Sequence, residues 1–105
     1  MKPVEYHPQA LEELFQATEY YESKVEGLGQ RFLDKIELCV TDISESPERW
    51  TYFVLNTRRR LLDRFPYMLV YLNEADRIYI LAVMHQRRRP GYWKKRLNLP
   101  VCDSG

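Results

Sequence analysis

The sequence predicts an α+β domain in which two helices cover one face of a mostly antiparallel β-sheet. Two consecutive segments in the first half repeat apolar residues at helical spacing. After residue 47 the pattern changes to aromatic and β-branched runs that are typical of strands. The chain has 105 residues, of which 45% are hydrophobic, and this length provides one core but not two. We therefore expect residues 1–105 to form a single domain.

The first half predicts a short strand and a helical hairpin. Residues 2–6 suit a first or edge strand. Pro8 suits the first turn of a helix that continues to residue 25. Gly27 and Gly29 leave only a short connection to a second helix, which stops before Pro47. The apolar face of this second helix is Phe32, Ile36, Cys39, Val40 and Ile43. Two amphipathic helices joined so closely are expected to pack antiparallel.

The second half predicts strands, a basic loop and a short helical turn. The expected strands are residues 50–55, 57–65, 67–72 and 78–84. A hairpin turn at 73–76 joins the last two strands, and a loop at 87–91 follows them. Residues 92–97 suit a C-terminal helical turn, and residues 98–105 a frayed tail. Because helices need to cover only one face of the sheet, we expect the other face to be a free working surface.

The formal net charge of +1 conceals an opposition between the two halves of the chain. Residues 1–57 carry 5 Lys/Arg and 11 Asp/Glu, whereas residues 58–105 carry 11 Lys/Arg and 4 Asp/Glu. The basic residues of the second half gather in three triplets, at 58–60, 87–89 and 94–96. Such clusters favour an acidic or polyanionic partner, although neutralisation of the acidic helices by the basic strands is the simpler alternative.

Several classes of protein are excluded or disfavoured. Apolar runs as long as residues 78–84 fall far short of the about 20 residues that a membrane span needs. The N-terminus has no apolar signal core, so we expect a cytoplasmic protein with no membrane partner. Cys39 and Cys102 lack metal-ligand spacing and suit free thiols. No Cys/His pairs, carboxylate clusters in the basic half or glycine-rich phosphate loops appear, so we expect no metal and no cofactor.

Four sequence segments together resemble a known family. They are LGQRF at 28–32, SPERW at 46–50, RRRLLDRFPYMLVYL at 58–72 and LAVMHQRRRPGYWKKR at 81–96. In this order, and with the predicted β-α-α-β-β-β-β arrangement, they resemble the RelE/ParE superfamily of plasmid-stabilisation toxins. The resemblance implies the toxin of a type II toxin–antitoxin module, held inactive by a cognate antitoxin.

The branches of this superfamily differ in target, and the resemblance leaves three functions open. RelE-like branches cut mRNA on the ribosome, and we favour this ribosome-dependent, metal-independent endoribonuclease activity as the first hypothesis. ParE-like branches poison DNA gyrase without chemistry of their own. A third alternative is an inactive toxin that only binds its antitoxin.

The nuclease hypothesis has four candidate catalytic residues. Metal-free RNA cleavage requires a base, cations that stabilise the phosphate charge, and an acid for the leaving oxygen. By the resemblance, Arg58 and Arg60 stand where the mRNA-cutting branch has two lysines on a strand, and Tyr92 stands at its C-terminal tyrosine. His85 is the remaining titratable group, because an unperturbed histidine has a pKa of about 6.5. We expect these four side chains to converge on one face of the sheet.

Two positions depart from the pattern of the mRNA-cutting branch. Met68 and Gln86 stand where that branch has arginines. Arginine also stays protonated near neutrality, so Arg58 and Arg60 are poor bases. Each candidate has a structural alternative as well: His85 could bond to backbone at a strand end, and one strand arginine could pair with the acidic helices.

The remaining cations of the second half are candidates for contacts with the target or antitoxin. They are Arg59, Arg87, Arg88, Arg89, Lys94 and Lys95. We expect an acidic or amphipathic antitoxin segment, which orders on binding, to cover the surface formed by Arg58, Arg60 and residues 87–89.

Overall fold

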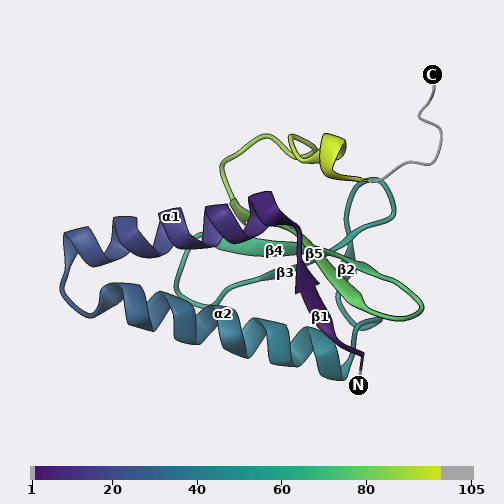
Figure 1. Ribbon diagram of the computed structural model, residues 1–105, viewed down its shortest axis with the longest axis horizontal. Coiled ribbons are helices and arrows are strands. Elements are labelled where there is room, and N and C mark those ends of the chain that lie inside the picture. The colour runs from purple at the N-terminus through teal and green to yellow at the C-terminus, as the bar shows by residue number, and fades with distance from the viewer. Residues whose placement is uncertain (1, 98–105) are drawn as a thin grey trace.

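The computed structural model describes residues 2–97 and has the predicted α+β architecture (Figure 1). The elements are β1 (Val4–Tyr6), α1 (Pro8–Lys24), α2 (Leu28–Glu45), β2 (Thr51–Tyr52), β3 (Arg58–Leu61), β4 (Tyr67–Asn73), β5 (Ile78–His85) and the 3₁₀ turn η1 (Lys94–Arg96). They form a five-stranded sheet in the order β1-β5-β4-β3-β2. Among the strand pairs of residues 2–97, only β1–β5 is parallel. The predicted helix pair, mostly antiparallel sheet and C-terminal helical turn are therefore confirmed.

The helical hairpin is held together by a carboxylate at its turn. Gly27 takes a left-handed conformation with φ of 87°, which ends the connection and starts α2. The Glu22 carboxylate accepts hydrogen bonds from the backbone N–H groups of Gly27 (3.0 Å) and Gly29 (2.9 Å). These bonds lower the pKa of Glu22. They also satisfy N–H groups that the start of a helix otherwise leaves free.

The main core lies between the helices and the sheet. α1 packs on β5 and α2 packs on β3, so each helix covers a different part of the same face. Fully buried members include Phe32 and Ile43 of α2, Leu69 and Tyr71 of β4, and Ile80 of β5. Aromatic rings pack against one another in this core, where the Phe32 ring contacts the rings of Phe65 and Tyr67.

The opposite face of the sheet is covered, and the expectation of a free working surface there was wrong. A second apolar cluster occupies it, formed by Met68, Val70, Leu81, Ala82, Met84 and Trp93. β4 and β5 are apolar on both faces, so both faces require cover. The register between β4 and β5 shifts between Val70 and Tyr71. Trp93, which is fully buried, supplies the cover from the C-terminal segment.

Two strands are shorter than the sequence predicts. Within the expected strand 50–55, only Thr51–Tyr52 is a strand. Residues 53–57 form a turn instead, in which the Phe53 backbone N–H donates a hydrogen bond to the Thr57 carbonyl oxygen (2.8 Å). The expected strand 57–65 is Arg58–Leu61. It ends where residues 62–66 form a loop, with Arg64 at a φ of 73°. Aromatic and β-branched content predicted a strand throughout residues 50–55, but the hydrogen bond between Phe53 and Thr57 closes a turn there instead. The predicted tail, residues 98–105, lies outside the described residues.

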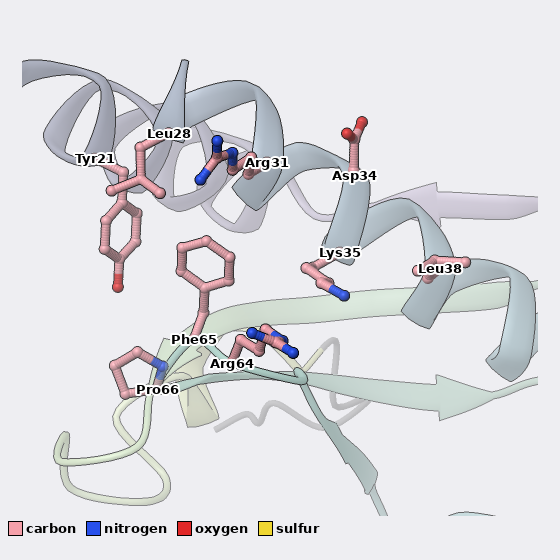
Figure 2. A pocket seen from close by; sticks show the side chains of 9 residues that line it. All are labelled: Tyr21, Leu28, Arg31, Asp34, Lys35, Leu38, Arg64, Phe65 and Pro66. Carbon is pink, nitrogen blue, oxygen red and sulfur yellow. The ribbon is translucent and has the colours of Figure 1, made fainter. Parts of the chain in front are cut away.

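A groove lies between α2 and the loop that joins β3 to β4 (Figure 2). Its volume is about 600 Å³. Its apolar lining consists of Tyr21, Leu28, Leu38, Phe65 and Pro66. Its charged residues are Arg31, Asp34, Lys35 and Arg64.

Substitution of Gly29 tests how closely the two helices approach. A methyl group at this position would lie 2.9 Å from both the Thr18 carbonyl oxygen and Glu22 Oε1. We predict that Gly29→Ala lowers the free energy of unfolding by about 1–2 kcal/mol, because overpacking outweighs the better helix propensity of alanine. Urea unfolding measures this change. Gln30→Ala, at the neighbouring exposed position, is the control and should change stability by less than about 0.5 kcal/mol; equal effects would contradict the steric explanation.

Candidate functional site

Arg58 and Arg60 lie on the same face of the sheet, as their alternation predicts, but this is the face that carries the helices. In the β3–β4 register they stand opposite Tyr71 and Leu69, which both belong to the main core. Arg59 stands opposite Val70 and therefore on the other face. Its guanidinium lies 4.8 Å from the Phe53 ring.

Arg58 joins β3 to the segment that follows α2. Its Nη1 donates hydrogen bonds to the carbonyl oxygens of Glu48 (2.9 Å) and Trp50 (2.7 Å). Its guanidinium also lies 3.9 Å from the centre of the Tyr52 ring. The side chain is half-buried and organises the backbone between α2 and β2.

Arg60 pairs with an acidic helix. Its Nη2 lies 2.7 Å from Asp42 Oδ2 on α2, and its Nη1 donates to the Leu61 carbonyl. The guanidinium lies 4.5 Å from the Trp50 ring. This is the structural alternative that the sequence left open, in which a strand arginine pairs with the acidic half of the chain.

His85 is the last residue of β5 rather than the first residue after it. Its Nδ1 accepts a hydrogen bond from the Arg87 backbone N–H (3.0 Å), and its ring contacts Tyr67 edge-on. In a neutral ring this bond places the proton on Nε2. The ring nitrogen that could accept a proton is therefore already used to hold the backbone of the following turn. His85 lines a hollow of about 230 Å³ together with Tyr20, Tyr67 and Arg88.

Tyr92 lies beside α1, with its hydroxyl directed at a carboxylate. The hydroxyl donates a hydrogen bond of 2.7 Å to Glu13 Oε2. Burial and this bond to Glu13 raise the pKa of Tyr92 well above its usual range. The guanidinium of Arg88 stacks on the Tyr92 ring at 3.6 Å.

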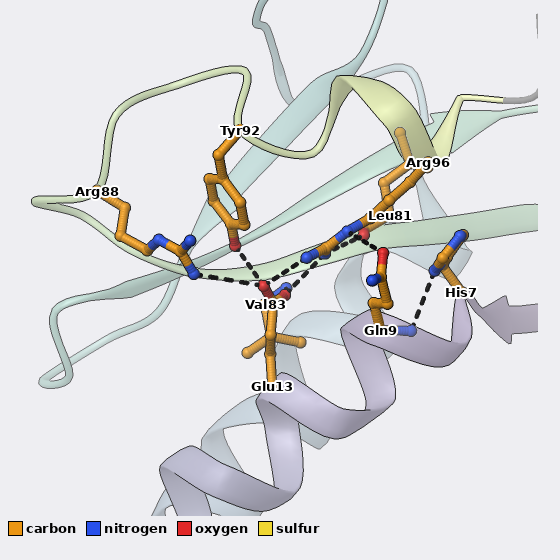
Figure 3. Close-up of polar contacts among 8 residues, drawn as sticks. All are labelled: His7, Gln9, Glu13, Leu81, Val83, Arg88, Tyr92 and Arg96. Atoms are coloured by element: carbon orange, nitrogen blue, oxygen red, sulfur yellow. Dashed lines mark hydrogen bonds and ion pairs between the residues drawn. The ribbon is translucent and has the colours of Figure 1, made fainter.

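Glu13 organises this region and was not recognised from the sequence (Figure 3). Its carboxylate accepts bonds from Arg96 Nη1 (3.0 Å), Arg96 Nη2 (2.8 Å) and the Val83 backbone N–H (3.0 Å), besides the Tyr92 hydroxyl. Arg88 lies 3.7 Å away. The side chains of Glu13 and Arg96 are only 13% and 9% exposed, so this is a nearly buried ion pair. We call Glu13, Tyr92 and Arg96 the C-terminal anchor.

The C-terminal anchor also completes the edge of the sheet. β1 pairs with β5 only from Ile78 to Ile80, so in the described part of the chain the edge beyond Ile80 has no neighbouring strand. Glu13 binds the Val83 N–H, and Arg96 binds the Leu81 carbonyl (3.0 Å). The helical spacing contained a signal for Glu13, because it lies three residues after Ala10 and four before Ala17, both buried. A glutamate next to a buried stripe is a candidate for a buried ion pair.

The four candidate catalytic side chains do not converge. Arg58 and Arg60 lie on β3, separated from β5 and His85 by β4, which is two strand spacings or about 10 Å. Tyr92 lies at the C-terminal anchor, where Arg88 connects it to the hollow that His85 lines. The remaining predicted contact residues are exposed: Arg87, Arg88, Arg89, Lys94 and Lys95.

The described residues hold no group of three or more His, Cys, Asp or Glu side chains placed for a metal ion. Cys39 is a buried core residue, and burial raises the pKa of its thiol to about 11. Within residues 2–97, neither helix combines the length and apolar character needed to cross a membrane.

Comparison with known proteins identifies the family. The family model of the ParE toxin of the type II toxin–antitoxin system, parDE, matches residues 4–90. The chain belongs to the ParE toxin family. The fold is similar to that of a solved chain described as the chromosomal ParDE toxin–antitoxin system from P. aeruginosa, with a TM-score of 0.65 and 18% sequence identity. The similarity covers 81% of this chain and 96% of that chain. No curated protein matches the sequence.

This membership confirms the resemblance to RelE/ParE toxins. The chain is a ParE-family toxin of a type II module, and a cognate antitoxin is its partner.

Removal of the Glu13 charge tests the C-terminal anchor. We predict that Glu13→Gln lowers the free energy of unfolding by about 3 kcal/mol, because it leaves Arg96 nearly buried without a counter-charge. Hydrogen exchange should accelerate first in residues 92–97 and at the β5 edge around Val83, because these backbone segments lose their shared partner.

The matched control is Glu12→Gln on the exposed side of the same helix turn. It should leave both stability and exchange nearly unchanged. If the two variants behave alike, the Glu13 carboxylate does not anchor the C-terminal segment.

Proposed function

We propose that this ParE-family toxin acts by binding its target rather than by cleaving RNA, and that the target is DNA gyrase, as the resemblance to ParE-like branches implies. The observation that carries the proposal is the placement of Arg58, Arg60, His85 and Tyr92. Arg58 and Arg60 lie on β3, apart from His85 and Tyr92, and each of the four groups holds part of the fold together.

The chemistry of these groups supports the same conclusion. The guanidinium groups of Arg58 and Arg60 are bound to backbone carbonyls and to Asp42, and a guanidinium is a poor base. His85 uses Nδ1 to accept from backbone, and Tyr92 has its hydroxyl proton bound to Glu13 and its pKa raised. Acid–base catalysis requires groups that exchange protons with the substrate at a common point. A binding toxin has no such requirement.

The surface proposed for target binding is the exposed cationic segment after β5. Arg87, Arg88 and Arg89 are exposed, and Lys94 and Lys95 follow on η1. Both ends of this segment are fixed. At the start, the Gln86 backbone N–H donates a hydrogen bond to the Pro66 carbonyl oxygen (2.8 Å), and at the end Arg96 forms an ion pair with Glu13. A charged segment held in this way loses little conformational freedom when it binds an acidic surface.

The ribosome-dependent endoribonuclease remains the second candidate function, because one observation favours it. His85, Tyr67 and Arg88 line the same hollow, which brings a titratable ring and a cation beside each other. In this alternative His85 would act through Nε2 after the ring releases the Arg87 N–H. The inactive toxin, which only binds its antitoxin, is the third possibility that the following experiment resolves.

Expression of the toxin without its antitoxin distinguishes these functions. We expect DNA replication to fall within minutes, with DNA damage, while messages stay intact. His85→Ala should stay toxic, whereas the double variant Arg87→Ala/Arg89→Ala should lose most toxicity and most inhibition of purified gyrase, because it removes two exposed cations from the binding surface. Replication, new protein synthesis and message integrity are measured in the same culture.

A double variant that removes two exposed cations elsewhere, Lys24→Ala/Arg49→Ala, is the control for net charge and should stay toxic. Prompt cleavage of messages that disappears in His85→Ala would replace the proposal with the nuclease. The absence of any growth defect in the wild type would leave antitoxin binding as the function.

A further inference from the structure

We propose that the groove between α2 and the β3–β4 loop is the seat of an acidic, amphipathic segment of the cognate antitoxin (Figure 2). This inference rests on the membership in the ParE family and adds a location that the basic triplets of the sequence did not indicate. Four observations carry it: an apolar floor, unpaired cations at the rim, a strained arginine, and continuity with the basic loop 87–89.

The floor of the groove is apolar and rigid. The Phe65 ring contacts Tyr21 with centroids 4.9 Å apart and Phe32 with centroids 5.2 Å apart, so its orientation is set by the core. Leu38 extends this floor along α2, and its side chain is 57% exposed. Rigid aromatic side chains bind apolar partners at a low cost in conformational entropy. The floor therefore suits the apolar face of a short helix or extended segment.

The rim of the groove is positively charged, and two of its guanidinium groups have no hydrogen-bonding or ion-pair partner within residues 2–97. The Arg31 and Arg64 guanidinium groups make no ion pair or hydrogen bond within residues 2–97. Lys35 lies 3.6 Å from Asp63, a loose pair whose acidic member is 74% exposed. The one acidic residue of the lining is Asp34, which accepts a hydrogen bond from Gln30. The excess of positive charge beside an apolar floor selects an acidic amphipathic partner.

Arg64 occupies a backbone conformation that a side chain disfavours. Its φ of 73° lies in the left-handed region, which costs a residue other than glycine about 1 kcal/mol. Within residues 2–97 the Arg64 guanidinium makes no hydrogen bond or ion pair that would offset this cost. Strain of this kind is common where a side chain serves a ligand.

The groove leads directly to the basic loop proposed for target binding. Pro66 lines the groove, and its carbonyl accepts the hydrogen bond from the Gln86 N–H at the start of residues 86–89. The next residues, Tyr67 and His85, form a pair across β4 and β5. An acidic segment seated in the groove therefore needs to extend only past Pro66 to reach Arg87. Occupation of the groove would carry negative charge onto the target-binding cations and neutralise the toxin.

Binding of the purified toxin to the full-length antitoxin encoded with it tests the proposal. Arg64→Gly removes the guanidinium and relieves the backbone, so it should bind the antitoxin about tenfold more weakly while its thermal stability is unchanged or higher. Arg31→Ala and Leu38→Ser should each weaken binding to a similar extent. Arg49→Ala and Leu11→Ser, which remove an exposed arginine and a partly exposed leucine outside the groove, are the matched controls and should stay close to wild type.

Two further measurements separate this inference from the proposed function. Hydrogen exchange of the complex should show protection of residues 28–38 and 64–66, and its absence there would overturn the proposal. Arg64→Gly should remain toxic in cells without antitoxin but should be rescued poorly by it. If Arg64→Gly instead loses toxicity and keeps full antitoxin affinity, the groove belongs to the target and not to the antitoxin. Because the affinity measurement involves neither gyrase nor RNA, its outcome does not depend on which target is correct.

Discussion

The contact of Glu13 with Arg96, Tyr92 and the Val83 N–H is the interaction on which the rest of the structure depends. β1 is too short to cover β5, so the edge beyond Ile80 would leave backbone groups without partners. Glu13 and Arg96 satisfy them with side chains. The same contacts hold the C-terminal segment against α1, which allows Trp93 to cover the far face of the sheet. The Glu13 carboxylate thus has two effects: it satisfies backbone groups at the sheet edge, and it holds the segment that covers the second apolar cluster.

This arrangement divides the cations of the chain into two groups. Arg58, Arg60 and Arg96 bind carbonyl oxygens or carboxylates and hold elements together. Those of the basic loop at residues 87–89, with Arg31 and Arg64 at the groove, are exposed, although Arg88 also stacks on Tyr92 and lies 3.7 Å from the Glu13 carboxylate. A half-buried arginine whose guanidinium already binds a carboxylate or a carbonyl oxygen has little left to offer a phosphate, whereas an exposed and unpaired one retains its full capacity. The division explains why a basic second half need not form one basic surface.

The groove and the basic loop give a physical route by which an antitoxin can control the toxin. The Pro66–Gln86 hydrogen bond places the end of the groove next to the start of the loop. A partner can gain affinity from the apolar floor at one place and neutralise the cations at the other. Apolar burial supplies most of the binding free energy, and charge complementarity supplies specificity and rate.

Local periodicity determined much of the fold from the sequence alone: both helices, the hairpin turn, β4 and β5, and the alternation of Arg58 and Arg60. The sequence also carried the family, through segments distributed along residues 28–96. Tertiary structure decided which face each arginine occupies, that the far face is covered, and that Glu13 is paired. The reason is the distance along the chain: Glu13 meets Arg96 across 83 residues, and Arg60 meets Asp42 across 18. Whether a charged side chain is structural or free depends on partners that only the register of the sheet and the packing of the helices bring within reach.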